Sequence, residues 1–211
     1  LGVPRETIRL VGDVNELKLM DSRSQTVDYT DPMKDYARRI ATQYSDFSGY
    51  VLVKGSPSCG GERVKRYNNK GNVQATDGMG LFAAELQAYD PLLPMEEDGR
   101  LNDHQLRENF VARVYAYHDW KTVSATPMTH KTLIDFWSRY KYMVMSHSIG
   151  HYKSIGRLLA NHEKREFEDI REQFIRLLMD ALNCLASRKS NTNVLEHVRG
   201  YLKKQMNRDE K

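Results

Sequence analysis

Hydrophobic and polar positions follow two different patterns along the chain, and the change falls near residue 125. In the first part, the short apolar runs at residues 8–11 and 50–53 have the length and composition of strands. Between them, residues 31–44 carry apolar side chains at three- and four-residue spacing, which predicts a helix. This strand, helix and strand order is typical of an α/β domain.

Further elements are expected before residue 125. Residues 78–88 have a helical pattern, Leu92 and Leu93 begin a short strand, and residues 102–120 form a long amphipathic helix. Asn102 or Asp103 would be the N-cap of that long helix. The stretch that follows it is polar and ends in a proline, so we place a domain boundary after residue 124.

The second part has a helical pattern throughout. Apolar residues recur at three- and four-residue spacing in four segments, at residues 129–145, 147–161, 163–186 and 191–205. The strand signals stop at the same point. We therefore expect an α/β domain over residues 1–124, followed by an all-α helical domain over residues 125–211.

Composition narrows the setting in which the protein works. No window of about 18 apolar residues indicates a membrane span, and the first residues do not resemble a secretory signal. The two cysteines, Cys59 and Cys184, are too few for a disulfide framework. We expect a cytoplasmic protein without a membrane segment. Because the chain opens on Leu1 in a loop-like stretch, we also expect the α/β domain to be truncated, without its N-terminal segment.

Charge is distributed unevenly between the two parts. Residues 1–127 hold 16 Lys and Arg against 18 Asp and Glu, whereas residues 128–211 hold 16 against 10. The second part is therefore the basic one, with a net charge of about +6.

The most informative segment is Tyr50-Val-Leu-Val-Lys-Gly-Ser-Pro-Ser-Cys-Gly-Gly, in which an apolar strand runs into a turn of small residues. Ligands gather at the carboxyl ends of strands in α/β proteins, so Cys59 could present its thiolate to a metal or cluster there. Gly60 and Gly61 would let backbone N–H groups approach the sulfur. The alternative is a buried, unreactive cysteine in a tight turn.

This segment resembles a known signature. The run Lys54-Gly-Ser-Pro-Ser-Cys-Gly60 is similar to the Leu-Lys-x-x-Ser-Pro-Ser-Cys-Gly motif of the thiouracil desulfidase (TudS) family, and residues 1–6 and 77–86 also resemble segments of that family. Residues 136–157 resemble the YbgA-type helical domain that is often fused to it. Together, the two resemblances cover nearly the whole chain.

The resemblance implies a 4Fe-4S cluster held by three cysteines, of which one iron takes sulfur from a thiolated pyrimidine and releases it as sulfide. Cys59 matches the third ligand, and the other two would lie upstream of residue 1, so this chain alone would be inactive. Ser56 and Ser58 are the local candidates for a catalytic hydroxyl, although both also suit a turn around Pro57. Arg5 could orient the pyrimidine or a phosphate, or could simply be solvated.

Basic and aromatic residues are interleaved in the second part. The cations are suited to phosphates and the tyrosines to exposed bases, which together favour RNA binding. The candidates for this role are Arg139, Lys141, His147, Lys153 and Arg157. His147 and His151 share a helical face, but no nearby carboxylate completes a metal site. The alternative is that the tyrosines are core residues and the cations form a solvated rim.

Three functions remain open on the sequence. The first is an iron–sulfur enzyme that removes sulfur from free thiouracil or from thiouridine in tRNA. The second is a non-catalytic RNA-binding module, whose affinity would fall steeply with salt. The third is a helical protein-interaction module. The sequence does not indicate which thiolated base is used, nor the oligomeric state.

Overall fold

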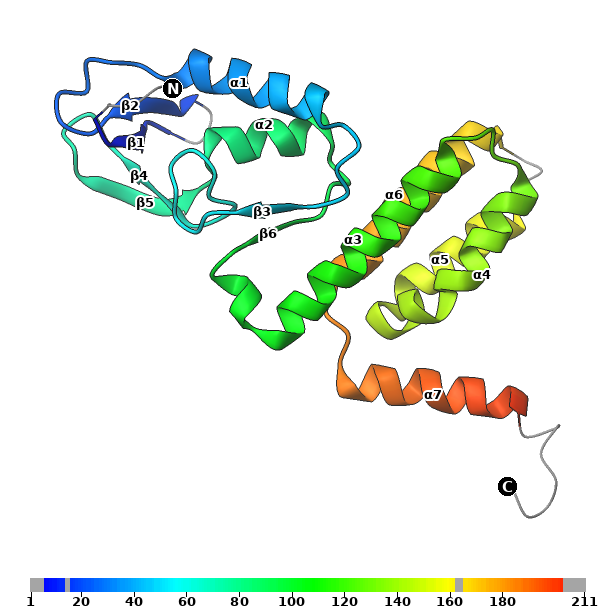
Figure 1. Ribbon diagram of the computed structural model, residues 1–211. Helices are drawn as coiled ribbons and strands as arrows, with labels where there is room; N and C mark the ends of the chain where they lie inside the picture. The colour runs from blue at the N-terminus through cyan, green and yellow to red at the C-terminus, as the bar shows by residue number, and fades with distance from the viewer. Residues whose placement is uncertain (1–5, 14–15, 162–164, 203–211) are drawn as a thin grey trace. The chain divides into compact units, whose positions relative to one another are not determined.

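The computed structural model describes residues 6–13, 16–161 and 165–202 (Figure 1). The chain divides into two units, Leu1–Phe110 and Val111–Lys211. Elements of the first unit are β1 (Ile8–Val11), β2 (Lys18–Asp21), α1 (Thr30–Gln43), β3 (Tyr50–Leu52), β4 (Val64–Tyr67), β5 (Val73–Gly78), α2 (Leu81–Tyr89), β6 (Met95–Glu97) and a 3₁₀ turn (Arg100–Asn102). The expected α/β class of this unit is confirmed.

The strands form two sheets. The larger sheet has the order β2-β1-β4-β5, in which β1 runs parallel to β4 and the other two pairs are antiparallel. The smaller sheet pairs β3 with β6 in parallel. The predicted strand at Leu92 and Leu93 is wrong, because Asp90 accepts hydrogen bonds from both of their N–H groups and closes a turn there. The strand β6 starts only after Pro94.

The core of the first unit lies between the sheets and the helices α1 and α2, which run side by side (Figure 1). Helical spacing brings the apolar face of α1 inward, as the sequence predicted. The buried cluster includes Leu10, Leu19, Met33, Ala37, Val64, Phe82 and Leu86, and Cys59 packs against its edge. The cysteine is therefore held against a rigid core.

The second unit is helical, as expected. Helix α3 (His104–Ser124) spans the division between the units and is followed by α4 (His130–His147), α5 (Ile149–Ala160), α6 (Phe167–Asn183) and α7 (Arg188–Leu202). Asp103 acts as the N-cap of α3, since its Oδ1 accepts from Leu106 N at 3.0 Å. The boundary expected after residue 124 coincides with the end of α3 and stays a prediction.

Aromatic rings form the core of the second unit. The rings of Trp120, Phe136 and Phe174 are buried, with centroids 5.4 to 6.0 Å apart. Edge-to-face and tilted packing at these distances is favourable beyond the burial itself. Three separate helices, α3, α4 and α6, are joined by this cluster.

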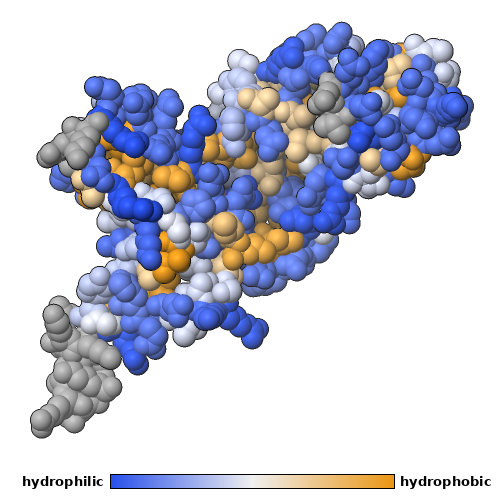
Figure 2. All heavy atoms as spheres, turned by 180° about the vertical axis from the view of Figure 1, so that it is seen from behind, coloured by the Kyte–Doolittle hydropathy of each residue, from blue (hydrophilic) through white to orange (hydrophobic). Residues whose placement is uncertain are grey.

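Hydrophilic residues cover most of the face shown in Figure 2, and apolar side chains gather in separate patches. Among the helices in the described ranges, none has both the length and the apolar character needed to cross a membrane.

Candidate active site

Cys59 lies in the loop between β3 and β4, seven residues after β3 ends. Because β3 and β6 are parallel, their carboxyl ends meet at one edge of the small sheet, with Leu52 opposite Glu97. Ligand sites in α/β proteins form at such edges. The loop and the segment after β6 are thus brought together, although about 40 residues separate them in the sequence.

Two serine hydroxyls surround the Cys59 sulfur. The Ser58 hydroxyl donates to Cys59 Sγ at 3.6 Å, and the thiol donates to Ser56 Oγ at 3.4 Å. Ser56 Oγ also accepts from the Cys59 backbone N–H at 3.3 Å and lies 3.1 Å from Ser58 Oγ. All three sequence-predicted residues of this segment therefore meet at one point. If the thiol loses its proton, both hydroxyls can donate to the thiolate.

Glycines bring the backbone of α2 against this turn. A Cβ on Gly80 would lie 2.3 Å from the Ser58 carbonyl oxygen, so only glycine fits there. The N–H groups of Phe82 and Ala83, in the first turn of α2, donate to that same oxygen at 2.8 and 3.4 Å. The positive end of the α2 dipole is consequently directed at the cysteine turn.

Three side chains at and just after the end of β6 hold the loop from its other side, and we call Glu97, Asp98 and Arg100 the β6 clamp. Glu97 Oε1 accepts from the Gly61 and Glu62 N–H groups at 2.9 and 3.2 Å. Asp98 Oδ1 accepts from Lys54 N at 3.0 Å, and Arg100 pairs with Glu62 at 3.0 Å. Sequence analysis missed these residues, because an acidic run after a proline has no pattern that relates it to a distant cysteine.

The roles expected for Gly60 and Gly61 need correction. Their N–H groups do not point at the sulfur: Gly60 N donates to Ser56 O at 2.8 Å, and Gly61 N donates to Glu97. Gly60 is needed instead for space, since a Cβ there would lie 2.6 Å from the Val64 side chain and 2.7 Å from Ser56 O. The glycines shape the loop rather than contact the sulfur.

Aromatic side chains lie close to the turn. The ring of Tyr50 is 5.7 Å from that of Phe82, which in turn is 5.9 Å from Tyr36. Burial raises the pKa of Tyr50, and the nearby Cys59 and Tyr36 raise it further. Tyr50 therefore keeps its proton in the physiological range and can donate a hydrogen bond.

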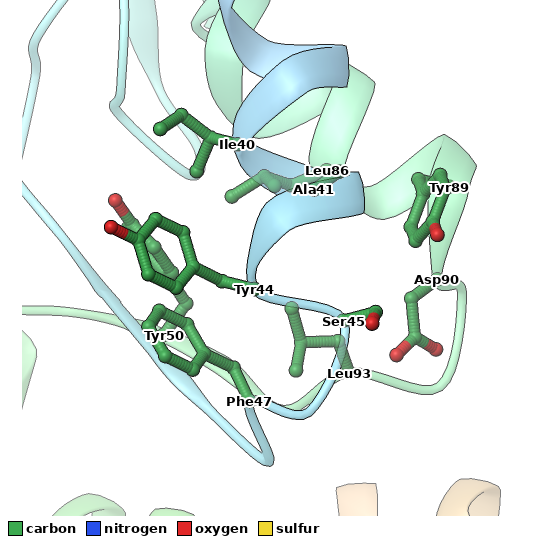
Figure 3. Close-up of a pocket in the computed structure, with 10 residues that line it drawn as sticks. All are labelled: Ile40, Ala41, Tyr44, Ser45, Phe47, Tyr50, Leu86, Tyr89, Asp90 and Leu93. Carbon is green, nitrogen blue, oxygen red and sulfur yellow. The ribbon is translucent and has the colours of Figure 1, made fainter.

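A separate pocket lies at the far ends of α1 and α2, between Tyr44, Phe47, Tyr50 and Tyr89 (Figure 3). The space that the centre of a water-sized sphere can occupy there is about 20 Å³, which leaves room for a water molecule but not for a pyrimidine ring. We therefore do not assign the substrate to it.

Among the described residues, no second ligand group accompanies Cys59. Within residues 6–13, 16–161 and 165–202, no three His, Cys, Asp or Glu side chains are grouped so that they could hold a metal. Cys184 is exposed at the end of α6, in the other unit, and Arg5 lies outside the described residues. Cys59 fits a cluster as one soft, partly exposed donor at a strand edge, and the further ligands are not among the described residues.

Comparison with known proteins matches two separate parts of the chain to two family models. Residues 1–98 match the family model described as 2-thiouracil desulfurase, and residues 141–211 match the model described as protein of unknown function (DUF1722). The first part of the chain is thus similar to 2-thiouracil desulfurases and the second part to the DUF1722 family. The uncharacterized protein YbgA of Escherichia coli (strain K12) is 28% identical over 104 residues, which are 49% of this chain and 62% of that protein. No solved structure matches the chain.

In the second unit, the cations that were proposed to bind RNA lie in different surroundings. Arg139 pairs with Asp119 at 2.8 Å, and His147 Nδ1 lies 2.5 Å from the Cys184 carbonyl oxygen. Lys141 lies over the Tyr142 ring, with its Nζ 5.0 Å from the centroid. Arg139 and His147 are thus engaged within the domain. His147 and His151 do not share a helix, because α4 ends at His147 and α5 begins at Ile149. The Nδ1 atom of His151 contacts Ser148 Oγ at 2.8 Å.

Arg157 lines a hollow between α5 and α6, and together with Lys153 it also lines an adjoining open hollow along α5. Two adjoining hollows share Arg157 and Asn161, and Arg165 lines one of them. The side chains that line the hollows are Lys153, Ser154, Arg157, Leu158, Ala160, Asn161, Arg165, Gln173 and Leu177. Among these described residues none carries a carboxylate, so the groove has the polarity that an anion requires. Arg165 was missed because it stands in a run of mixed charge.

Proposed function

We propose that the protein is an iron–sulfur-dependent desulfidase that removes sulfur from a thiolated uracil and releases it as sulfide. Support comes from the match to the 2-thiouracil desulfurase family and, above all, from the convergence of Ser56, Ser58 and Cys59 at one strand edge. The chain spans 62% of the curated relative that it matches, so the activity of the whole protein belongs to this proposal.

Cys59 is proposed as one cluster ligand, with two further cysteines supplied from outside the described residues. When bound, the cluster would supply a Lewis-acidic iron that makes sulfide a better leaving group. The Ser58 hydroxyl donates to the ligand sulfur and fixes its orientation. Ser56 Oγ, 3.1 Å from Ser58 Oγ, is proposed to accept a hydrogen bond from an attacking water and so to orient it. Tyr50 would offer a hydrogen bond to a base carbonyl.

Replacing the two cysteines separately tests the proposal. We expect Cys59→Ala to abolish sulfide release, because a cluster ligand is lost, while Cys184→Ala keeps wild-type activity. The measurement is sulfide released from 2-thiouracil and from thiolated tRNA by the whole protein after anaerobic reconstitution. Equal activity of the two variants would exclude a catalytic role for Cys59.

RNA is the proposed form of the substrate, because Arg157 and Arg165 line one hollow between α5 and α6, and Lys153 lines an adjoining hollow that also includes Arg157. Each phosphate contact adds roughly one unit to the slope of affinity against salt. We expect Arg157→Glu with Arg165→Glu to weaken tRNA binding at least about tenfold and to reduce that slope by about 2. Electrophoretic titration at several salt concentrations measures both quantities.

Arg199→Glu is the matched control for this experiment, because Arg199 is an exposed cation of the same domain that already pairs with Glu196. It should leave the slope almost unchanged. If the double variant and the control behave alike, the groove does not bind RNA. Salt-independent association of the domain with a protein would favour an interaction module instead.

A further inference from the structure

Glu97 is a buried carboxylate that accepts hydrogen bonds from two successive backbone N–H groups. Its side chain is 4% exposed, at the last position of β6, and one oxygen accepts both N–H groups that follow the cysteine turn. A Cβ on Gly61 would lie 3.5 Å from the Glu97 Cγ, so the loop passes directly over the side chain. Burying a carboxylate is costly unless hydrogen bonds compensate. The two hydrogen bonds from the loop backbone offset part of that cost.

The two hydrogen bonds fix the segment that leaves Cys59. Ser56 and Gly80 hold the turn from within, through Gly60 N to Ser56 O and Gly80 N to Gly60 O. Beyond Gly60, the next two N–H groups both depend on Glu97. Since β6 is anchored to β3 along its whole length, Glu97 transmits the rigidity of the small sheet to the loop.

We propose that Glu97 is a positioning residue for the cysteine site: its carboxylate holds the Gly61–Glu62 backbone so that the Cys59 sulfur keeps one orientation. This inference rests on the proposed function for its catalytic consequence, but not for its geometry. Glu97 acts through the loop backbone and is not assigned a contact with substrate.

The reactivity of Cys59 tests the geometry in this chain alone. In a Cys184→Ser background Cys59 is the single thiol, and because its sulfur is only partly exposed, its alkylation rate by iodoacetamide reports how far the loop restricts access to that sulfur. We expect Glu97→Ala to raise that rate about tenfold, the factor that loss of a charge-assisted hydrogen bond gives. Glu97→Gln should stay near wild type, because a single amide oxygen can accept both N–H groups.

Asp21→Ala is the matched control. Asp21 is another buried carboxylate, 2% exposed, whose oxygens accept from the backbone N–H groups of Ser24, Gln25 and Val27, away from the cysteine turn. Its removal should destabilise the unit without changing Cys59 alkylation. If Asp21→Ala and Glu97→Ala raise the rate equally, or if Glu97→Ala leaves it unchanged, the positioning role is refuted. Should Glu97→Ala not fold by circular dichroism, Glu97→Asp replaces it, with the same expectation.

Iron binding then separates the two proposals. In the whole protein after reconstitution, Glu97→Ala should lower the iron content per chain while Glu97→Gln retains it. If alkylation behaves as expected and the wild type takes up no iron, the proposed function fails and the positioning of Cys59 stands. If the wild type binds iron and Glu97→Ala retains all of it with an unchanged cluster spectrum, Glu97 does not position a ligand.

Discussion

Gly80→Ala should destabilise the first unit by about 3 kcal/mol, the upper end for an inserted methyl group that its surroundings cannot accommodate. The added Cβ would lie 2.3 Å from the Ser58 carbonyl oxygen, 2.4 Å from its carbon and 2.7 Å from Cys59 N. All three atoms are backbone, so no side chain can rotate away. Gly80 has φ −63° and ψ 141°, which any residue adopts, so the effect is steric and not conformational. Urea unfolding followed by circular dichroism measures it.

Gly156→Ala is the control for that substitution. Gly156 is inside α5, and nothing lies within 4 Å of the Cβ it would gain. Alanine there should be neutral or stabilising by up to about 1 kcal/mol, because alanine favours the helix. A Gly80→Ala protein as stable as the wild type would show that α2 does not press against the cysteine turn as described.

Phe174→Ala should lower the free energy of unfolding of the second unit by about 3 to 5 kcal/mol. Phe174 is fully buried, and its ring contacts those of Trp120, Phe136 and Trp137. Truncation leaves a cavity among rigid rings that cannot collapse to fill it. Both tryptophans of the chain belong to this unit, so their fluorescence during urea unfolding reports the loss directly.

Tyr115→Ala gives the comparison for an exposed aromatic residue. Tyr115 is 70% exposed on α3, and its removal should change stability by less than about 0.5 kcal/mol. Similar losses for Phe174→Ala and Tyr115→Ala would contradict the proposed aromatic core.

The sequence predicted the elements whose hydrophobic period is strong. The helices α1 and α4 to α6 were recognised because each buries one apolar stripe, as Met33 and Ala37 show for α1. The strands β2, β4 and β5 were missed, because they carry charged residues such as Lys18 and Arg66 at strand positions. Arg66 is nevertheless buried, and its charge is balanced by Asp77, with Nε and Oδ1 2.6 Å apart. No local sequence pattern predicts such a pair.

The candidate site was predictable only where it is local in sequence. Ser56, Ser58 and Cys59 share one turn, so their proximity follows from the motif itself. Glu97 reaches the turn through the parallel pairing of β3 and β6, which sequence periodicity does not specify. Arg139 pairs with Asp119, one helix earlier, which the sequence pattern does not indicate, and its contact with RNA stays a prediction.

Iron analysis tests most directly whether Cys59 is a ligand of an iron–sulfur cluster, as we propose. Iron and acid-labile sulfide per chain should be measured after anaerobic reconstitution of the whole protein, for wild type, Cys59→Ala and Cys184→Ala. We expect a full cluster in the wild type and in Cys184→Ala, and no cluster in Cys59→Ala. Equal iron in all three proteins, or none in the wild type, would contradict it.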